Sequence, residues 1–357
     1  LPCRWGIPFF TVDRQSQPQP HACEIVFWHV MAPAHFNRSA LGKIKKITMA
    51  WQDTQERGNT FWLRVTLLLY KLIGRHLLKL IVAPLVIFWY WLFTPRLRRA
   101  SRQYLDRITP HLQAAPAKPL STYRHLLSFA WVFVDKLAGW LGDVSEDELV
   151  LQGHEHFRAH YGKGALIITT HFGNMELLRA LKADSDQVIN VLVYNKHTEH
   201  FNRLLKHINP NALVRLISVD ELGIDTAMYL QERLDAGEWL MVAADRTPIQ
   251  SQRTDVLPFL GYDSAWPQGG WLLASLLKCP VMAVFCYPHQ NKQHVAIHML
   301  SERFSFPRSE RNAQLRRIMQ DYVAIVEQHC LLTPYQWFNF YPFWDEQNPN
   351  TDAKVAA

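Results

Sequence analysis

From Gly164 onward, short apolar runs alternate with amphipathic segments, and this alternation limits the folds open to the chain more than any other feature. The apolar runs predict strands at 165–169, 188–193, 213–218, 239–243, 281–286 and 295–299. The amphipathic segments predict helices at 175–182, 199–208, 223–236, 269–278 and 309–329. Strands that alternate with helices are typical of an α/β fold, so we expect a central mixed, partly parallel sheet flanked by helices.

One histidine stands where such a fold places its ligands. The apolar run 165–168 is followed by Thr169, Thr170 and His171, and Glu176 lies at the start of the next predicted helix. Open α/β sheets bind ligands at the carboxyl ends of their strands. A carboxylate one helical turn away can hold an imidazole in one tautomer, which equips a histidine to take a proton from a hydroxyl. The alternative interpretation is structural: His171 caps a helix whose first turn carries Glu176.

Three sequence blocks carry a family resemblance. They read HFGNME at 171–176, then ADRTP, PFLG and AWPQG beginning at 244, 258 and 265, and finally QWFNFY at 336–341. In this order, between about Trp51 and Asp345, they resemble the bacterial lipid A lauroyl/myristoyl acyltransferase family, part of the glycerolipid acyltransferase superfamily. Met175 stands where the family usually has an aromatic residue, and methionine is a fair substitute by volume.

The resemblance implies an O-acyltransferase in which His171 is the general base and Glu176 its partner. It implies a fatty acyl donor bound as a thioester to acyl carrier protein or coenzyme A, and a lipid hydroxyl as acceptor. It implies no metal and no organic cofactor, and a place on the cytoplasmic face of a bacterial inner membrane. Met175 and the last block suggest a branch away from lipid A itself, similar to branches linked to aryl-polyene lipids, and an amine acceptor stays open.

Further residues are expected to bind substrate. Asp245 and Arg246 follow a predicted strand, and a guanidinium can hold a phosphate or carboxylate, such as that of the donor's phosphopantetheine arm. Backbone N–H groups around Gly173 and Asn174 are expected to face the oxyanion, and Gly269 opens a helix that offers an anion seat. The alternatives are an ordinary salt bridge for the Asp–Arg pair and a plain helix start at Gly269.

A membrane segment is predicted near the amino-terminal third of the chain. Residues 77–93 read LLKLIVAPLVIFWYWLF, with one charge at Lys79 and a break at Pro84. Basic residues flank the run on both sides, which argues against a clean span and favours an anchor in the plane of an anionic membrane. A net charge of +7 agrees with anionic partners, and nucleic-acid motifs are not visible. A true span and a buried core helix are the alternatives.

These patterns predict four parts. Residues 1–48 lack periodicity and are expected to be an upstream extension, with a regulatory tail as the competing interpretation. Residues 49–110 form a membrane-anchoring helical segment, and a Pro/Ala-rich linker and a helix at 123–141 follow it. Residues 120–345 form the α/β acyltransferase domain, and 346–357 form a tail.

Other chemistries are weaker candidates. The five cysteines form no CxxC pair, and Cys279 and Cys286 are expected to be buried. His156 and His160 share a helical face, but the zinc-protease pattern HExxH is absent, so no metal site is predicted. No GxSxG nucleophile motif is present. A membrane-bound acyl hydrolase and a non-catalytic lipid-binding protein of the same fold remain as alternatives.

Overall fold

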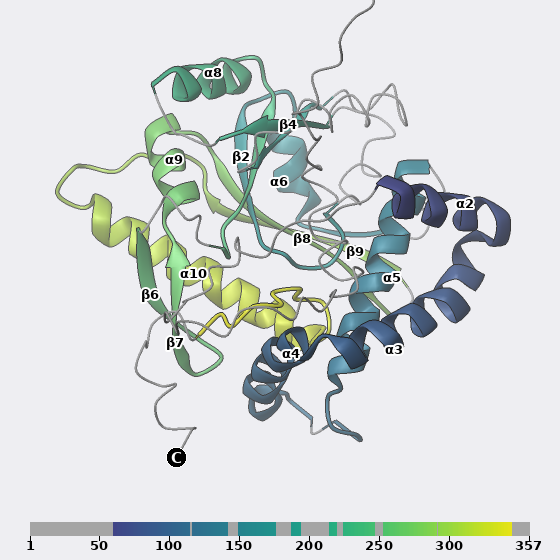
Figure 1. Ribbon diagram of the computed structural model, residues 1–357. Coiled ribbons are helices and arrows are strands. Elements are labelled where there is room, and N and C mark those ends of the chain that lie inside the picture. Colours follow the sequence, from purple (N-terminus) through teal and green to yellow (C-terminus); the bar gives the residue numbers. More distant parts are fainter. Residues whose placement is uncertain are drawn as a thin grey trace, which may run out of the picture.

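The computed structural model describes residues 60–114, 116–141, 149–175, 187–193, 214–219, 224–246, 253–290 and 292–344. Its main sheet has seven strands: β1 (Leu149–Gln152), β2 (Ala165–Thr169), β3 (Ile189–Val193), β4 (Val214–Ser218), β5 (Trp239–Ala243), β8 (Val281–His289) and β9 (Lys292–Ser301). Their order is β1-β9-β8-β2-β5-β3-β4. The neighbouring strands β8 and β9 are seen side by side in Figure 1. The five strands from β8 to β4 run parallel, whereas β9 and β1 run in the opposite direction. The predicted mixed, partly parallel sheet is therefore confirmed, and it is mostly parallel.

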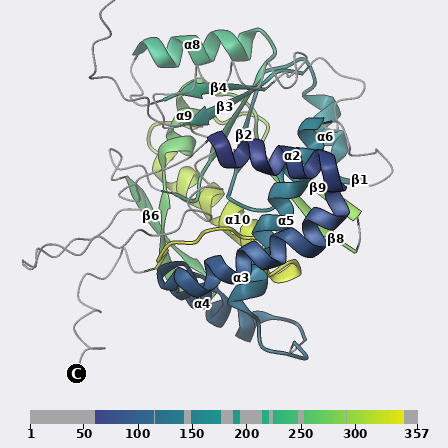
Figure 2. The same cartoon turned by 45° about the vertical axis from the view of Figure 1, so that its right-hand side comes forward.

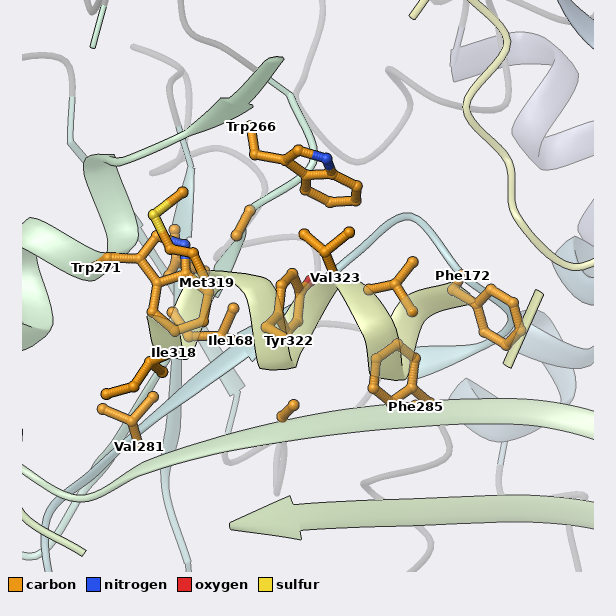
Figure 3. Packing of buried hydrophobic residues seen from close by; sticks show 14 of the residues in the cluster. Ile168, Phe172, Trp266, Trp271, Val281, Phe285, Ile318, Met319, Tyr322 and Val323 are labelled. Atoms are coloured by element: carbon orange, nitrogen blue, oxygen red, sulfur yellow. The ribbon is translucent and has the colours of Figure 1, made fainter. Parts of the chain in front are cut away.

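The sheet is covered on both faces, which explains its unbroken apolar strands. In β2, Leu166 and Ile168 face one hydrophobic cluster, and Ala165 and Ile167 face another. The first face packs against α9 (Gly269–Leu277) and α10 (Arg311–Leu332). Figure 3 shows α10 side chains lying over Ile168 and side chains of β8. The second face receives Phe157 from α6 (His154–Ala159).

The sequence predicts the central strands best. β2 and β5 have their predicted bounds, and β3 and β4 begin one residue later than predicted. The prediction shortens β8 and β9 because polar residues such as His289 and Lys292 interrupt the apolar pattern near their turn. It misses β1, which has only four residues, and the separate hairpin of β6 (Thr254–Phe259) and β7 (Tyr262–Pro267).

Four predicted helices are present with end shifts of one to three residues: α5 (Thr122–Leu141), α8 (Ile224–Asp235), α9 and α10. The predicted helix at 199–208 lies outside the described residues, as does nearly all of the one at 175–182. Cys279, Cys286 and Cys330 are buried free thiols.

The amino-terminal helices form a bent band along one side of the molecule (Figure 2). They are α2 (Thr60–Leu77), the π-helical turn η2 (Leu78–Val82), α3 (Ala83–Phe93) and α4 (Pro95–Ile108), followed by the 3-10 turn η3 (Thr109–His111). Gly74 interrupts α2 with φ 76°, a left-handed conformation that glycine adopts without steric cost. By length and composition, the segment Val65–Phe93 could cross a membrane.

Polar contacts fasten this segment sideways to α5. The buried carboxylate of Asp135 pairs with Lys79 and accepts a hydrogen bond of 2.8 Å from Arg75 Nε. Trp131 Nε1 donates to the carbonyl oxygen of Lys79 at 2.9 Å, and Tyr123 donates to that of Pro84 at 3.0 Å. The segment is thus attached to the protein along much of its length.

Buried histidines make the stability of the fold pH-dependent. Burial lowers the pKa of His125 to about 4 and that of His329 to about 3. A histidine that is neutral when folded adds full stability above its unfolded pKa of 6.5, and this stability is lost as the pH falls. We expect His125 alone to lower the free energy of unfolding by about 1.4 kcal/mol for each unit that the pH falls between roughly 6.5 and 4. Urea unfolding in detergent at pH 7, 6 and 5 measures this slope.

Two histidine variants, one test and one matched control, check this assignment. His125→Gln should flatten the slope, whereas His154→Gln, at a half-exposed histidine outside the core, should leave it unchanged. Equal slopes in wild type and His125→Gln would contradict the assignment of this pH dependence to His125.

Candidate functional site

Sheet register brings two predicted site residues together. Thr169, the last residue of β2, lies opposite Ala243, the last residue of its neighbour β5. His171 and Asp245 each stand two residues beyond these strand ends, so the parallel register places them side by side. His171 Nδ1 lies 2.7 Å from Asp245 Oδ1. This contact lies at the carboxyl edge of the sheet, where the sequence predicted the site.

The carboxylate of Asp245 is buried and held from several sides. Its Oδ2 accepts hydrogen bonds from Thr170 Oγ1 at 2.5 Å, from the His171 backbone N–H at 2.9 Å and from Trp337 Nε1 at 3.3 Å. Burial alone would raise the pKa of Asp245. The neighbouring His171 and Arg246 and the hydrogen bond from Thr170 outweigh it, so the pKa lies below its ordinary value and the group is ionised.

An ionised carboxylate can only accept, which fixes the tautomer of His171. Nδ1 carries the hydrogen that Asp245 accepts, so Nε2 carries the lone pair. The side chain is 24% exposed. Burial and the cation of Arg246 lower the pKa of His171, Asp245 opposes them, and Lys136 adds a smaller lowering effect. The imidazole is therefore neutral at pH 7 and able to accept a proton.

The turn after His171 is fixed by backbone hydrogen bonds. Gly173 N–H donates to the Gln336 carbonyl oxygen at 2.9 Å, and Asn174 N–H donates to that of Cys286 at 2.6 Å. Phe338 N–H donates to the His171 carbonyl oxygen at 2.7 Å. Gly173 has φ +58°, and a Cβ there would lie 1.8 Å from the Cys286 oxygen, so only glycine fits. The N–H groups expected at an oxyanion thus have internal acceptors in this conformation.

Arg246 and Gly269 lie near the same strand ends. Arg246 Nη2 donates to the Phe338 carbonyl oxygen at 3.2 Å, and its guanidinium lies 5.9 Å from the centre of the Tyr341 ring. Gly269 begins α9, whose next residue rests on β5 and β2: a Cβ at Gly270 would lie 3.0 Å from Val242 and 3.2 Å from Ile168.

Comparison with known families matches most of the chain to one family. A family model of bacterial lipid A biosynthesis acyltransferases matches residues 59–346, which include the sheet, the His171–Asp245 pair and the amino-terminal helices. The chain belongs to this family. A search of curated proteins finds no significant match.

Membership of the lipid A biosynthesis acyltransferase family makes the chain an acyltransferase that acts on lipids. The match covers the predicted α/β part and most of the predicted anchoring segment. The family match specifies no acyl donor.

Glu176, the expected partner of His171, lies outside the described residues, so that pairing stays a prediction. Asp245 was predicted to follow a strand and to bind substrate, and no role was predicted for Thr170 or Trp337. A signal was present in the sequence: Asp245 follows a second buried run just as His171 follows the first.

The other histidine cluster lies elsewhere. His160 Nε2 lies 3.0 Å from Glu302, while His154 and His156 flank Glu155 at 3.7 and 3.9 Å. Among the described residues, no group of three or more His, Cys, Asp or Glu side chains is arranged to hold a metal ion.

Proposed function

We propose that this family member transfers a fatty acyl chain from a thioester, on acyl carrier protein or coenzyme A, to a lipid hydroxyl, with His171 as general base. The observation that carries the proposal is the contact of 2.7 Å between His171 Nδ1 and the buried Asp245 carboxylate. It leaves Nε2 of a partly exposed imidazole as the proton acceptor.

The reaction needs no enzyme nucleophile. His171 Nε2 takes the proton of the acceptor hydroxyl as its oxygen attacks the thioester carbonyl carbon. The new C–O bond forms, the C–S bond then breaks, and the leaving thiolate takes the proton back from His171. Asp245 stabilises the imidazolium that forms between these two steps, and its three further donors keep it ionised and correctly placed.

We propose Asp245 as the positioning partner of His171 in the described conformation. Glu176 is proposed as a second carboxylate that acts on the same histidine. Arg246 is proposed to contact an anionic group of a substrate, because its cation lies beside the Asp245–His171 pair. Gly269 is proposed to contribute to substrate binding, because free backbone N–H groups at the start of α9 can hold an anionic group. Gly173 and Asn174 are proposed to shape the turn that presents His171.

Product analysis tests the reaction. Membranes that contain wild type or His171→Ala receive labelled acyl carrier protein thioester or labelled acyl-coenzyme A, and the lipids are resolved by mass spectrometry. An acylated lipid made only by wild type supports transfer and identifies both donor and acceptor, including an ester or an amide product. Free fatty acid without acylated lipid would favour the hydrolase alternative, and identical products would favour the lipid-binding alternative.

We also propose that the segment Val65–Phe93 lies in the plane of an anionic membrane. Its outer face exposes large apolar side chains: Leu72, Leu80, Leu85, Trp89 and Phe93 are 58–73% exposed. Its inner face is attached to α5 through Asp135, Trp131 and Tyr123. A helix that is fastened sideways to a domain cannot turn to cross the bilayer without breaking these contacts. Basic residues of α4 directly follow it: Arg96, Arg98, Arg99 and Arg102.

We expect Leu85→Glu combined with Trp89→Glu to lower binding to vesicles with anionic lipids at least about tenfold, because each side chain loses apolar burial in the membrane. Flotation of the full chain with phosphatidylglycerol-containing vesicles measures this binding. Leu276→Glu is the matched control, because Leu276 on α9 is 61% exposed and Leu85 is 60% exposed.

Equal losses in the two variants would contradict a specific membrane face. The in-plane orientation is tested separately with Lys71→Cys and Arg96→Cys in sealed vesicles. An impermeant maleimide should label both new thiols from the same side, and protection of one of them would show a span.

A further inference from the structure

We infer that Trp337 is a positioning residue, which restrains the Asp245 carboxylate through its indole N–H and so limits the basicity of His171. The inference rests on the proposed function only in that His171 acts as the base. Trp337 lies 166 residues from His171 in the sequence and belongs to the carboxyl-terminal block that resembles the family, yet neither the sequence nor the family match assigns it a role.

The indole joins a short relay of hydrogen bonds. Trp337 Nε1 lies 3.1 Å from Thr170 Oγ1 and 3.3 Å from Asp245 Oδ2. The Thr170 hydroxyl donates to the same Oδ2 at 2.5 Å, so its oxygen is left to accept from the indole. Chains of hydrogen bonds polarise one another, so the indole strengthens the threonine's bond to the carboxylate and also donates to it directly.

Packing and a second histidine fix the indole itself. Trp337 is fully buried, and its ring contacts Tyr104, Phe259 and Phe343 at centroid distances of 5.0 to 5.2 Å. His125 Nε2 lies 2.8 Å from the Trp337 carbonyl oxygen, which can only accept, so Nε2 carries the hydrogen and Nδ1 accepts from Ser101 Oγ at 2.9 Å. Ser101 and His125 come from α4 and α5, so these two helices hold the residue that donates to the Asp245 carboxylate.

The electrostatic consequence has a definite sign. Donors to Oδ2 draw negative charge away from the oxygen that holds His171 Nδ1, which weakens the stabilisation of the imidazolium. Among the described residues, the other charged groups that act on the ring are the cations Arg246 and Lys136, which also favour its neutral form. Removal of the indole donor should therefore raise the proton affinity of His171 and loosen the carboxylate.

The test compares two buried tryptophans of one cluster. Trp337→Phe removes the indole donor, and Trp344→Phe removes the same atoms from a ring 6.0 Å away. Within the described part of the chain, Trp344 Nε1 has no hydrogen-bond partner, which makes it the matched control. The first readout is the pH dependence of His171 modification by diethylpyrocarbonate, followed by mass spectrometry of its peptide. The second is kcat and KM for acyl transfer.

Trp337→Phe is expected to move the His171 titration upward by about half a pH unit or more and to lower kcat about tenfold with KM nearly unchanged. Trp344→Phe should change neither quantity. Thr170→Val should act in the same direction as Trp337→Phe, and Thr170→Ser, which retains the hydroxyl, should restore the wild-type titration. If Trp337→Phe fails to fold, the two Thr170 variants still test the inference.

An unchanged or lowered His171 titration in a folded Trp337→Phe protein would overturn the inference, as would equal shifts in the two tryptophan variants. The modification readout needs no turnover. A shift without any acyl transfer in the wild type would uphold the role of Trp337 on His171 and refute the proposed function instead.

Discussion

Replacement of His171 by alanine is expected to lower the rate of acyl transfer by roughly 10²- to 10⁴-fold, the range that a positioned general base contributes. The lost group is the Nε2 lone pair, which Asp245 leaves available by holding Nδ1–H at 2.7 Å. No other described histidine contacts this carboxylate. Single-turnover rates with an excess of lipid acceptor measure the chemical step.

The fold should survive this change, because the His171 side chain is 24% exposed and the turn is held by backbone groups. His154→Ala is the matched control at an exposed histidine, and it should keep full activity. If His171→Ala turned over within a few-fold of the wild-type rate, His171 would have no part in the mechanism. That result would favour the alternative of a non-catalytic lipid-binding protein.

Asp245→Asn is expected to lower kcat by roughly 10²- to 10⁴-fold, because an amide neither stabilises the imidazolium nor fixes the Nδ1–H tautomer. The variant should also be less stable than wild type. The carboxylate accepts four hydrogen bonds through two oxygens, and an amide nitrogen in either place would face a donor. Activity and thermal unfolding of the same preparation separate the two effects.

Glu176→Gln, measured in parallel, decides which carboxylate serves His171. If Asp245 is the partner in the described conformation, the aspartate variant should lose far more activity than the glutamate variant. A larger loss in Glu176→Gln would show that the histidine pairs with the helix residue during catalysis and that Asp245 has a structural role.

The strands of the sheet were largely predictable because strands that are buried on both faces have unbroken apolar runs in their sequence. Most of the helices that flank the sheet were predictable as well. The same reasoning placed His171 and Asp245 at strand ends. Their pairing was not predictable, since it depends on β5 inserting between β2 and β3 in the sheet although β3 and β4 precede it in the chain. Strand order is a property of the whole packed domain, and 74 residues separate the two side chains.

The role of Trp337 was hidden for a related reason. Its block resembles the family, but a tryptophan among phenylalanines and tyrosines looks like core packing. Only the position of its indole nitrogen beside Thr170 and Asp245 distinguishes it from Trp344 in the same cluster.

The hydrogen bonds that join Gly173 to Gln336 and His171 to Phe338 also set an order of events during protein synthesis. Chains emerge from the ribosome amino end first, so the apolar segment Val65–Phe93 is made long before residues 336–341. A nascent chain therefore carries the apolar segment and His171 before it carries the residues that fix the turn after His171. The conformation of the turn that carries His171 is therefore completed only after nearly all of residues 59–346 have been synthesised.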